Sequence, residues 1–169
     1  MKIYVAGHTG MVGSAVVRKI EADGTHTWVG KTRAELDLTD DKAVKDYVSQ
    51  EKPDAVIMAA AKVGGIMANV NDPVGFLTEN LKIQTSLIEA AHQNKVPKLV
   101  FLGSSCIYPK DAPQPIKEEY LLTGPLEPTN QSYALAKIAG IQMVNSYRQQ
   151  FGYKWISLMP TNLYGPNDN

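Results

Sequence analysis

Three glycines spaced three residues apart follow a short apolar run at residues 3–6: they are Gly7, Gly10 and Gly13. Apolar residues then recur at helical spacing, so the pattern predicts a strand, a tight turn and a helix over about residues 11–23. Glycines let such a turn approach a diphosphate closely, and the helix N-terminus offers it N–H groups and a positive dipole end. The spacing also occurs in structural loops, but its place between strand and helix favours a nucleotide-binding turn. The candidate residues in this stretch are Gly7, His8, Thr9, Gly10, Met11, Val12 and Gly13.

Charge and composition exclude several classes of protein. The chain has 169 residues, enough for one domain with a core, and its 17 basic residues balance its 17 acidic ones. This balance argues against nucleic-acid binding, and no apolar run approaches the roughly 18 residues that a membrane helix needs. The single cysteine, Cys106, forbids an internal disulfide and fits a reducing cytoplasm. We expect no signal peptide and no metal site.

Strand and helix patterns alternate along the whole chain. Strands are predicted at residues 3–6, 26–30, 55–59, 98–103 and 154–159, and helices at residues 11–23, 41–51, 73–94 and 131–151. This order predicts an α/β fold, a doubly wound parallel sheet with helices on both faces. The five prolines between residues 109 and 128 argue against regular structure there, and this loop is expected to border a substrate cleft.

The segment after the second strand bears on the choice of cofactor. In nicotinamide-binding domains an acidic residue here would bind the adenosine ribose and repel a 2′-phosphate, but this chain has Lys31 and Arg33. Basic groups can neutralise a 2′-phosphate, so the sequence favours NADP over NAD; the alternative is that both are solvated surface residues. Asp37 and Leu38 are expected beside the adenine. The small residues around Ala60, after the third strand, would let a cofactor lie against the backbone.

Polar residues that could carry chemistry follow the fourth strand and lie on the last helix. Because ligands of such sheets bind beyond the carboxyl ends of the strands, Ser104, Ser105 and Cys106 are candidates. Tyr133 and Lys137 are four residues apart and share one helix face. We expect the Lys137 ammonium to lower the pKa of Tyr133 from about 10, which would suit acid–base chemistry near neutral pH. A serine hydroxyl would complete the site by donating a hydrogen bond to a carbonyl undergoing reduction.

Five blocks in the same order resemble the extended short-chain dehydrogenase/reductase family, which acts on nucleotide sugars. The blocks are residues 6–13, 59–65, 101–109, 126–130 together with 133–140, and 159–166. Within that family the chain looks most like NADP-dependent enzymes that epimerise C3 and C5 of a GDP-4-keto-6-deoxy sugar and then reduce C4. Dehydratases of the family have Thr-Asp-Glu at the position of residues 104–106, which argues against that activity here; a nucleotide-sugar 4-epimerase is a further alternative.

The resemblance implies a role for each matching residue. Tyr133 would donate the proton in C4 reduction, Lys137 would support it and hold the nicotinamide ribose, and Ser104 would be the catalytic serine. Cys106 would exchange protons at C3 and C5, while Ser105 and Asn162 would contact the GDP-sugar substrate. The implied cofactor contacts beyond the glycine turn are Arg33, Leu38, Ala60, Leu102, Gly103, Ser104, Lys137, Pro160, Thr161, Asn162 and Leu163.

Two departures from the family pattern leave alternatives open. Thr9 stands where the family often has an arginine for the adenosine phosphate. The family's catalytic histidine and most of its substrate-binding domain would follow residue 169, and His8, His26 and His92 do not occupy that place. The alternative is therefore a cofactor-binding module without turnover of its own, either alone or paired with a second chain. The family also implies a homodimer formed through the helices at residues 77–91 and 133–147.

Overall fold

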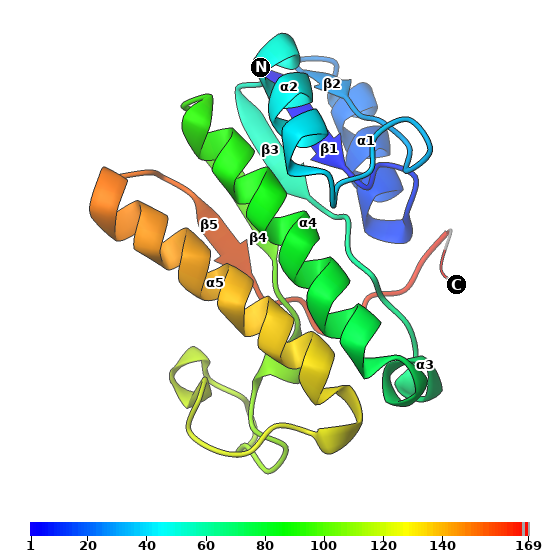
Figure 1. Ribbon diagram of the computed structural model, residues 1–169, viewed down its shortest axis with the longest axis vertical. Coiled ribbons are helices and arrows are strands. Elements are labelled where there is room, and N and C mark those ends of the chain that lie inside the picture. Colours follow the sequence, from blue (N-terminus) through cyan, green and yellow to red (C-terminus); the bar gives the residue numbers. More distant parts are fainter. Residues whose placement is uncertain (167, 169) are drawn as a thin grey trace.

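The structure of the chain is a computed structural model that describes residues 1–166 and 168. Within these residues a five-stranded sheet has the order β2-β1-β3-β4-β5, and every neighbouring pair is parallel (Figure 1). The strands are β1 Lys2–Ala6, β2 Thr27–Val29, β3 Ala55–Met58, β4 Lys98–Leu102 and β5 Ile156–Leu158. The helices are α1 Met11–Asp23, α2 Asp41–Glu51, α3 Ile66–Asn71, α4 Pro73–Gln93 and α5 Gln131–Phe151. The predicted doubly wound parallel sheet is confirmed.

Local capping signals set the ends of the long helices. The side chains of Asp40 and Asp72 accept hydrogen bonds from backbone N–H groups three residues later, at 3.0 and 2.9 Å, and begin α2 and α4. Pro73 occupies the first turn of α4, where a missing N–H costs nothing. Gly24 and Gly152 end α1 and α5 in the left-handed conformation, with φ of 67° and 73°. The bounds predicted for these helices therefore agree with the structure to within one residue.

The last four strands are shorter than predicted, the first is one residue longer, and one helix was not predicted at all. The second strand covers residues 27–29 rather than 26–30, and the fifth covers 156–158 rather than 154–159, because these two edge strands pair with a neighbour on one side only. The short helix α3 follows the third strand; its buried Asn69 amide donates to the carbonyl oxygens of Gly64 and Gly65, at 3.0 and 3.1 Å. A helix held by a polar side chain in this way does not need apolar residues at helical spacing, so the sequence pattern did not indicate it.

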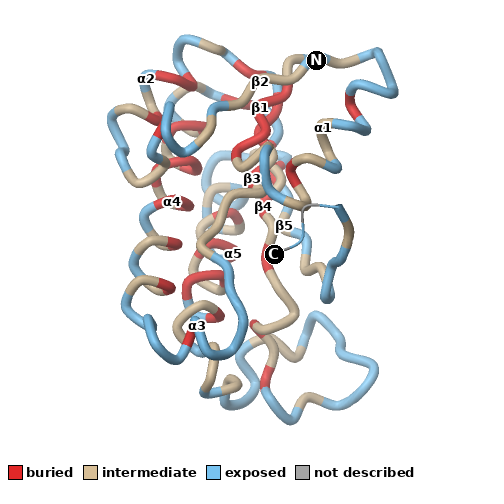
Figure 2. Tube along the Cα trace, turned by 90° about the vertical axis from the view of Figure 1, so that its right-hand side faces the viewer, coloured by how far each residue is buried: buried red, intermediate tan, exposed pale blue. Residues whose placement is uncertain are grey.

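Helices cover the two faces of the sheet unequally. On one face α2, α4 and α5 enclose the main core with residues such as Val48, Leu87 and Val144, which are fully buried against β1, β3 and β4. On the other face α1 packs through Ile20 against Ile3 and Val5. Figure 2 shows the sheet between these two layers. The prediction of helices on both faces is confirmed, with one helix on the second face.

The second face is open over β4 and β5. Ile156 and Leu158 of β5 are 44% and 46% exposed, although both are large apolar residues in a strand. The facing residues of β4, Val100 and Leu102, are half-buried. Around β1 and β2 the described residues therefore form three layers, helix, sheet and helix. Around β5 they form two layers, helix and sheet.

The chain reverses its direction of winding between β1 and β3. It passes from β1 to β2 on one side and from β3 to β4 and β5 on the other, so the carboxyl ends of β1 and β3 form the topological switch point. Gly7 leaves β1 here with φ of 84°, and a Cβ at this position would lie 2.6 Å from the backbone nitrogen of Ala60. Ligands of doubly wound sheets bind at this point, so the fold itself places the site.

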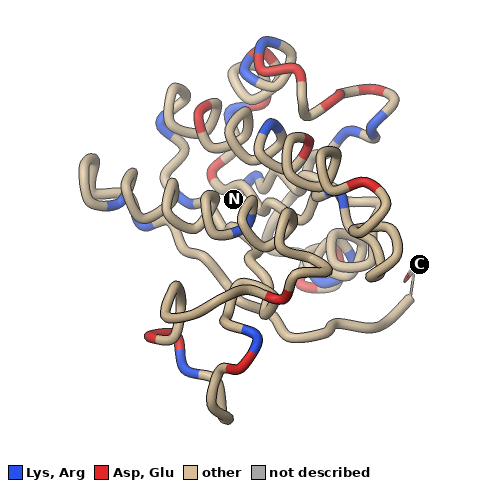
Figure 3. The backbone as a smooth tube through the Cα atoms, turned by 60° about the horizontal axis from the view of Figure 1, so that its bottom comes forward, with Lys and Arg blue, Asp and Glu red and all other residues tan. Residues whose placement is uncertain are grey.

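The proline-rich segment is irregular, as predicted. Between residues 109 and 128 the structure has one short 3-10 turn, Glu118–Tyr120, and a second such turn, Pro128–Asn130, leads directly into α5. Charges of both signs are spread over the chain and over this loop (Figure 3). Among the described residues, every helix is too short or too polar to cross a membrane.

The glycine turn generates a test of the fold. A Cβ on Gly13 would overlap the carbonyl oxygen of Gly7, whereas a Cβ on Gly10 would lie 3.5 Å from that oxygen, an ordinary contact. Gly13→Ala should therefore lower the free energy of unfolding by about 3 kcal/mol, because the backbone must move apart. Gly10→Ala should lower it by about 1 kcal/mol or less. Urea unfolding followed by circular dichroism measures both, and equal losses would contradict the described turn.

Candidate active site

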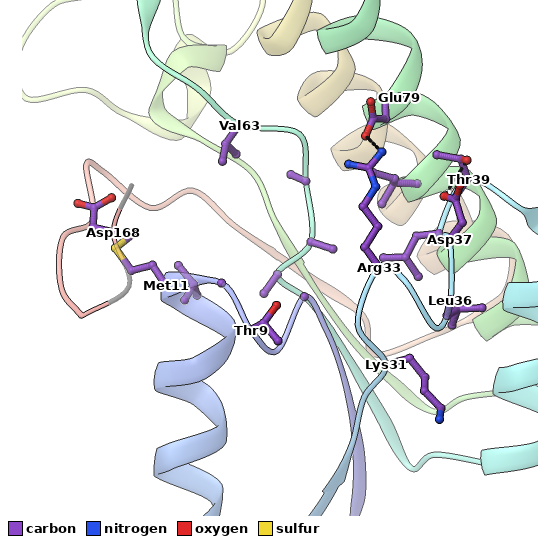
Figure 4. A pocket seen from close by; sticks show the side chains of 18 residues that line it. Thr9, Met11, Lys31, Arg33, Leu36, Asp37, Thr39, Val63, Glu79 and Asp168 are labelled. Atoms are coloured by element: carbon purple, nitrogen blue, oxygen red, sulfur yellow. Dashed lines mark hydrogen bonds and ion pairs between the residues drawn. The ribbon is translucent and has the colours of Figure 1, made fainter. Parts of the chain in front are cut away.

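A pocket of about 380 Å³ opens at the carboxyl ends of β1 and β3 (Figure 4). Its walls come from the glycine turn, the segment after β2, the end of β3 and one side of α4. Eight of the residues predicted to contact a cofactor line it: Gly7, Thr9, Gly10, Met11, Val12, Arg33, Leu38 and Ala60. The switch point and the glycine pattern therefore lead to the same place in the fold.

The glycine turn has the geometry of an anion cradle. The N–H of Gly10 donates to the carbonyl oxygen of Gly7 at 3.1 Å, which closes the turn. Gly10 is the N-cap of α1, and no side chain of the described residues caps the helix there. The first N–H groups of α1 therefore face a pocket wall with no side-chain cap from this part of the chain, at the positive end of the helix dipole. A diphosphate fits such a terminus.

Two residues of the turn lie outside the pocket. The His8 ring packs against Trp28 of β2, with ring centroids 5.3 Å apart, and its buried Nδ1 atom has no hydrogen-bond partner among the described residues. Gly13 is buried behind the turn, against Gly7. Both residues thus pack on the side of the turn that faces away from the pocket, and neither lines the pocket.

The basic residues after β2 are both paired with carboxylates. Lys31 Nζ lies 3.3 Å from an oxygen of Glu35, and Arg33 Nη2 lies 3.0 Å from an oxygen of Glu79 on α4. Asp37 also lines the pocket, and hydrogen bonds from Thr39 hold the pKa of its carboxyl below the usual range, with the charge of Arg33 as a smaller cause. The pocket therefore presents cations and carboxylates side by side.

Sequence reasoning missed the contribution of α4 to this pocket. Glu79 and Ile83, four residues apart on one face of the helix, both line it. The only signal in the sequence is this spacing, which most amphipathic helices share. It could not have shown which helix lies beside the segment after β2.

The end of β4 carries a second cluster of predicted site residues. Ser104 begins a short 3-10 turn, Ser105–Ile107, and its hydroxyl accepts a hydrogen bond from the N–H of Cys106 at 3.3 Å. The N–H groups of Gly103 and Ser105 donate to Leu158 and Pro160, at 2.7 and 3.2 Å. These bonds align the end of β4 with the segment that follows β5.

The predicted residues after Pro160 are exposed in the structure. Thr161, Asn162 and Leu163 lie along this segment, and none of them lines the described pocket. Leu102 and Gly103 end β4 close to this segment, also outside the pocket. The structure thus brings the predicted residues together in two groups on one edge of the sheet: the pocket at β1 and β3, and the cluster at β4 and β5.

α5 presents Tyr133 and Lys137 to the end of β4. Lys137 is 5% exposed, and its Nζ donates to the carbonyl oxygen of Leu102 at 2.8 Å. The same nitrogen lies 5.7 Å from the centroid of the Tyr133 ring. Burial lowers the pKa of Lys137 to about 8. This amine is therefore held in place beside the phenol and titrates close to neutral pH.

The expected lowering of the Tyr133 pKa is wrong for this structure. Burial and, as a smaller cause, the negative charge of a Cys106 thiolate raise the pKa of Tyr133 to about 12, and a polar interaction with the Ser104 hydroxyl acts in the opposite direction. Lys137 is not among the causes of this shift, and its Nζ donates to the carbonyl oxygen of Leu102 instead of to the phenol. The same causes show that Ser104, Cys106 and Tyr133 lie within interaction range of one another. Tyr133 is therefore protonated at neutral pH, a proton donor rather than a base.

The burial of Lys137 predicts how stability depends on pH. Its folded pKa of about 8 lies below its usual value of 10.5, so between these values the unfolded chain binds more protons and stability rises with pH. From pH 7 to 9.5 the free energy of unfolding of the wild-type chain should rise by about 2 kcal/mol relative to Lys137→Met. Urea titrations across this range measure the difference, with Lys19→Met as the control for loss of an exposed lysine. A difference that does not change with pH would contradict the burial of this amine.

Among the described residues, no group of three or more histidine, cysteine, aspartate or glutamate side chains could hold a metal ion. The chemistry available at this edge comes from a phenol, an amine, a hydroxyl and a thiol. These groups lie next to a pocket whose glycine turn fits a diphosphate.

Comparison with known proteins agrees with this geometry. The chain is 61% identical over 168 residues to GDP-L-fucose synthase 1 of Arabidopsis thaliana, covering 99% of this chain and 52% of that protein. It matches a GDP-mannoheptose C4 reductase from Campylobacter jejuni with NADP bound, with a TM-score of 0.95 and 45% identity, over 99% of this chain and 53% of that one. A GDP-L-fucose synthetase from Naegleria fowleri bound to NADP matches with a TM-score of 0.89 and 32% identity, over 99% and 56%.

The chain thus spans about half the length of the relatives it matches. Residues 3–169 match the family described as the NAD dependent epimerase/dehydratase family. This match covers the glycine turn, the end of β4 and the Tyr133–Lys137 pair within one family pattern. The chain therefore belongs to the NAD dependent epimerase/dehydratase family.

Proposed function

We propose that residues 1–169 form the dinucleotide-binding part of an NADP-dependent epimerase/reductase that converts GDP-4-keto-6-deoxy-D-mannose to GDP-L-fucose. The observation that carries the proposal is the gathering of Ser104, Cys106, Tyr133 and Lys137 at the end of β4, on the same edge as the glycine-turn pocket. The 61% identity to a GDP-L-fucose synthase supports the choice of substrate.

The residues of the pocket fit a dinucleotide. The uncapped start of α1 and the left-handed Gly7 would hold the diphosphate, and Leu38 would lie against the adenine. Arg33 would meet the adenosine 2′-phosphate. Lys137 would hold the nicotinamide ribose, and residues 160–163 would border the nicotinamide. NADPH, when bound, supplies the hydride for reduction of C4.

Reduction of C4 requires a proton for the carbonyl oxygen. Tyr133 is protonated at neutral pH and lies within interaction range of the Ser104 hydroxyl, so the phenol would donate the proton while Ser104 would orient the oxygen. Lys137 lies beside the phenol, and its positive charge would stabilise the phenolate that the transfer leaves. In this reaction the C4 carbonyl gains a hydride on carbon and a proton on oxygen, and Tyr133 is reprotonated from solvent.

Epimerisation requires proton exchange at C3 and C5. Hydrogens at these carbons are acidic because the C4 carbonyl stabilises the enolate that remains. Cys106 lies close enough to Tyr133 for its charge to raise the pKa of the phenol, so it shares the place where C4 would be held. A thiolate there would remove one of these protons, and a proton would return to the opposite face of the carbon.

A second candidate function is a cofactor-binding module that binds NADP without turnover, alone or as one member of a pair of chains. The observation in its favour is that the chain spans about half of its relatives' length. Another nucleotide-sugar 4-epimerase would need no cysteine at residue 106. A dehydratase would need carboxyl groups where this chain has Ser105 and Cys106.

We propose that two copies associate through α4 and α5 and that the protein acts in the cytoplasm. Figure 3 shows that charged positions are sparse along α5, whose charged residues are Lys137 and Arg148. Lys137 is buried. The exposed positions of α5 include Leu135, Gln142 and Ser146, which are uncharged. A face depleted of charge is typical of the centre of an interface. Size-exclusion chromatography that finds only monomer would count against this association.

The test is cofactor binding and turnover by the purified chain. We expect NADPH to bind in titration calorimetry, and Tyr133→Phe to bind it with an affinity within about twofold, since the hydroxyl is not part of the pocket that holds the nucleotide. Where GDP-4-keto-6-deoxy-D-mannose is reduced, the same variant should lower the rate by about 100-fold or more, because the proton donor is lost.

The outcomes separate the two candidates. NADPH oxidation that depends on the sugar supports the epimerase/reductase. Binding without oxidation supports the module. A chain that is folded by circular dichroism but binds neither NADPH nor NADH would overturn both.

A further inference from the structure

The cation expected to meet a 2′-phosphate is already held by a carboxylate. Arg33 Nη2 lies 3.0 Å from Glu79 Oε1, and both residues line the pocket (Figure 4). The Arg33 side chain is 79% exposed, whereas that of Glu79 is only 20% exposed. The arginine is therefore the partner that is open to solvent, and the glutamate is the more enclosed one.

Among the described residues that line this pocket, the cations are Arg33 and Lys31. Lys31 points away from Arg33 and pairs with Glu35 (Figure 4). Thr9, on the glycine turn, carries no charge. A phosphate that binds here would rely on Arg33 for its ion pair, and it would compete with the Glu79 carboxylate for that arginine.

Glu79 keeps a partner if Arg33 leaves it. Its second oxygen, Oε2, lies 3.4 Å from Lys62 Nζ, and Lys62 is also paired with Asp72 at 2.7 Å. Two cations and two carboxylates thus form one chain of ion pairs, Arg33–Glu79–Lys62–Asp72. Transfer of Arg33 to a phosphate would not strand a buried carboxylate.

We propose that Glu79 is a specificity-determining residue that competes with the adenosine 2′-phosphate for Arg33 and so weakens binding of NADP relative to NAD. The inference rests on the proposed binding of a dinucleotide in this pocket. Its physical basis is that NADP must break the Arg33–Glu79 pair and bring a phosphate close to a carboxylate. NAD carries a hydroxyl at that position, so it requires neither change.

The test is the variant Glu79→Gln, which removes the charge and keeps the size of the side chain. We expect its dissociation constant for NADP⁺ to fall by about three- to tenfold, because a single exposed ion pair and one like-charge contact are removed. The dissociation constant for NAD⁺ should stay within about twofold. Titration calorimetry with both nucleotides measures this, and the gain for NADP⁺ should shrink at higher salt.

The chain offers a matched control in Glu89→Gln. Glu89 lies on the same helix, pairs with Lys45 at 3.7 Å and does not line the pocket. The control changes the net charge equally, so both of its dissociation constants should stay within about twofold of wild type. Thermal unfolding checks that each variant is folded, and Glu79→Ala provides a second variant with the same expected direction.

The outcomes separate this inference from the proposed function. Wild-type protein that binds neither nucleotide would overturn the proposed function. Wild-type protein that binds NADP⁺, with no tighter binding in either Glu79 variant, would overturn only the role of Glu79. An equal increase in affinity for NADP⁺ and NAD⁺ in the Glu79 variants would also overturn this role. The role would likewise be overturned if the increase in NADP⁺ affinity stayed the same in the double variant that also carries Arg33→Gln, since the competition acts through Arg33.

Discussion

The close approach of two backbones at Gly7 is the constraint on which this structure depends. Gly7 turns out of β1 with a positive φ, and the end of β3 passes so near that a side chain at this position would meet the backbone of Ala60. This contact fixes the turn at the switch point, and the turn fixes the start of α1 beside the pocket. A side chain here would separate the two strand ends that together form the floor of the pocket.

The parallel arrangement of the strands gathers groups that are far apart in the sequence. Every strand of the described sheet ends on the same edge, so the glycine turn, Ser104 and the segment after β5 face one region. The bond from Lys137 to the carbonyl of Leu102 ties α5 to the end of β4 and brings Tyr133 with it. Burial then sets the protonation of these groups: it lowers the pKa of the amine and raises that of the phenol.

Features with local causes could be predicted from the sequence, and those with distant causes could not. Asp40, Gly24 and Gly152 act within one turn of their own helices, so the helix ends were predictable. The ion pair between Arg33 and Glu79 joins two segments that are separated in the sequence by α2, β3 and α3. Neither segment has a sequence feature that indicates this contact. The pKa of Tyr133 was predicted in the wrong direction, because the sequence shows that Lys137 is near but not that both groups are buried.

Among the described residues, the sheet ends on each side in a strand of three residues, β2 and β5. A free strand edge is a template on which another chain can add its own strand, and a long edge invites aggregation. Here the unpaired backbone groups on either side are too few to form an extended ladder, even though Ile156 and Leu158 leave apolar surface next to one of them. The shortness of the outer strands thus protects the described part of the chain against edge-to-edge association while its second face stays open.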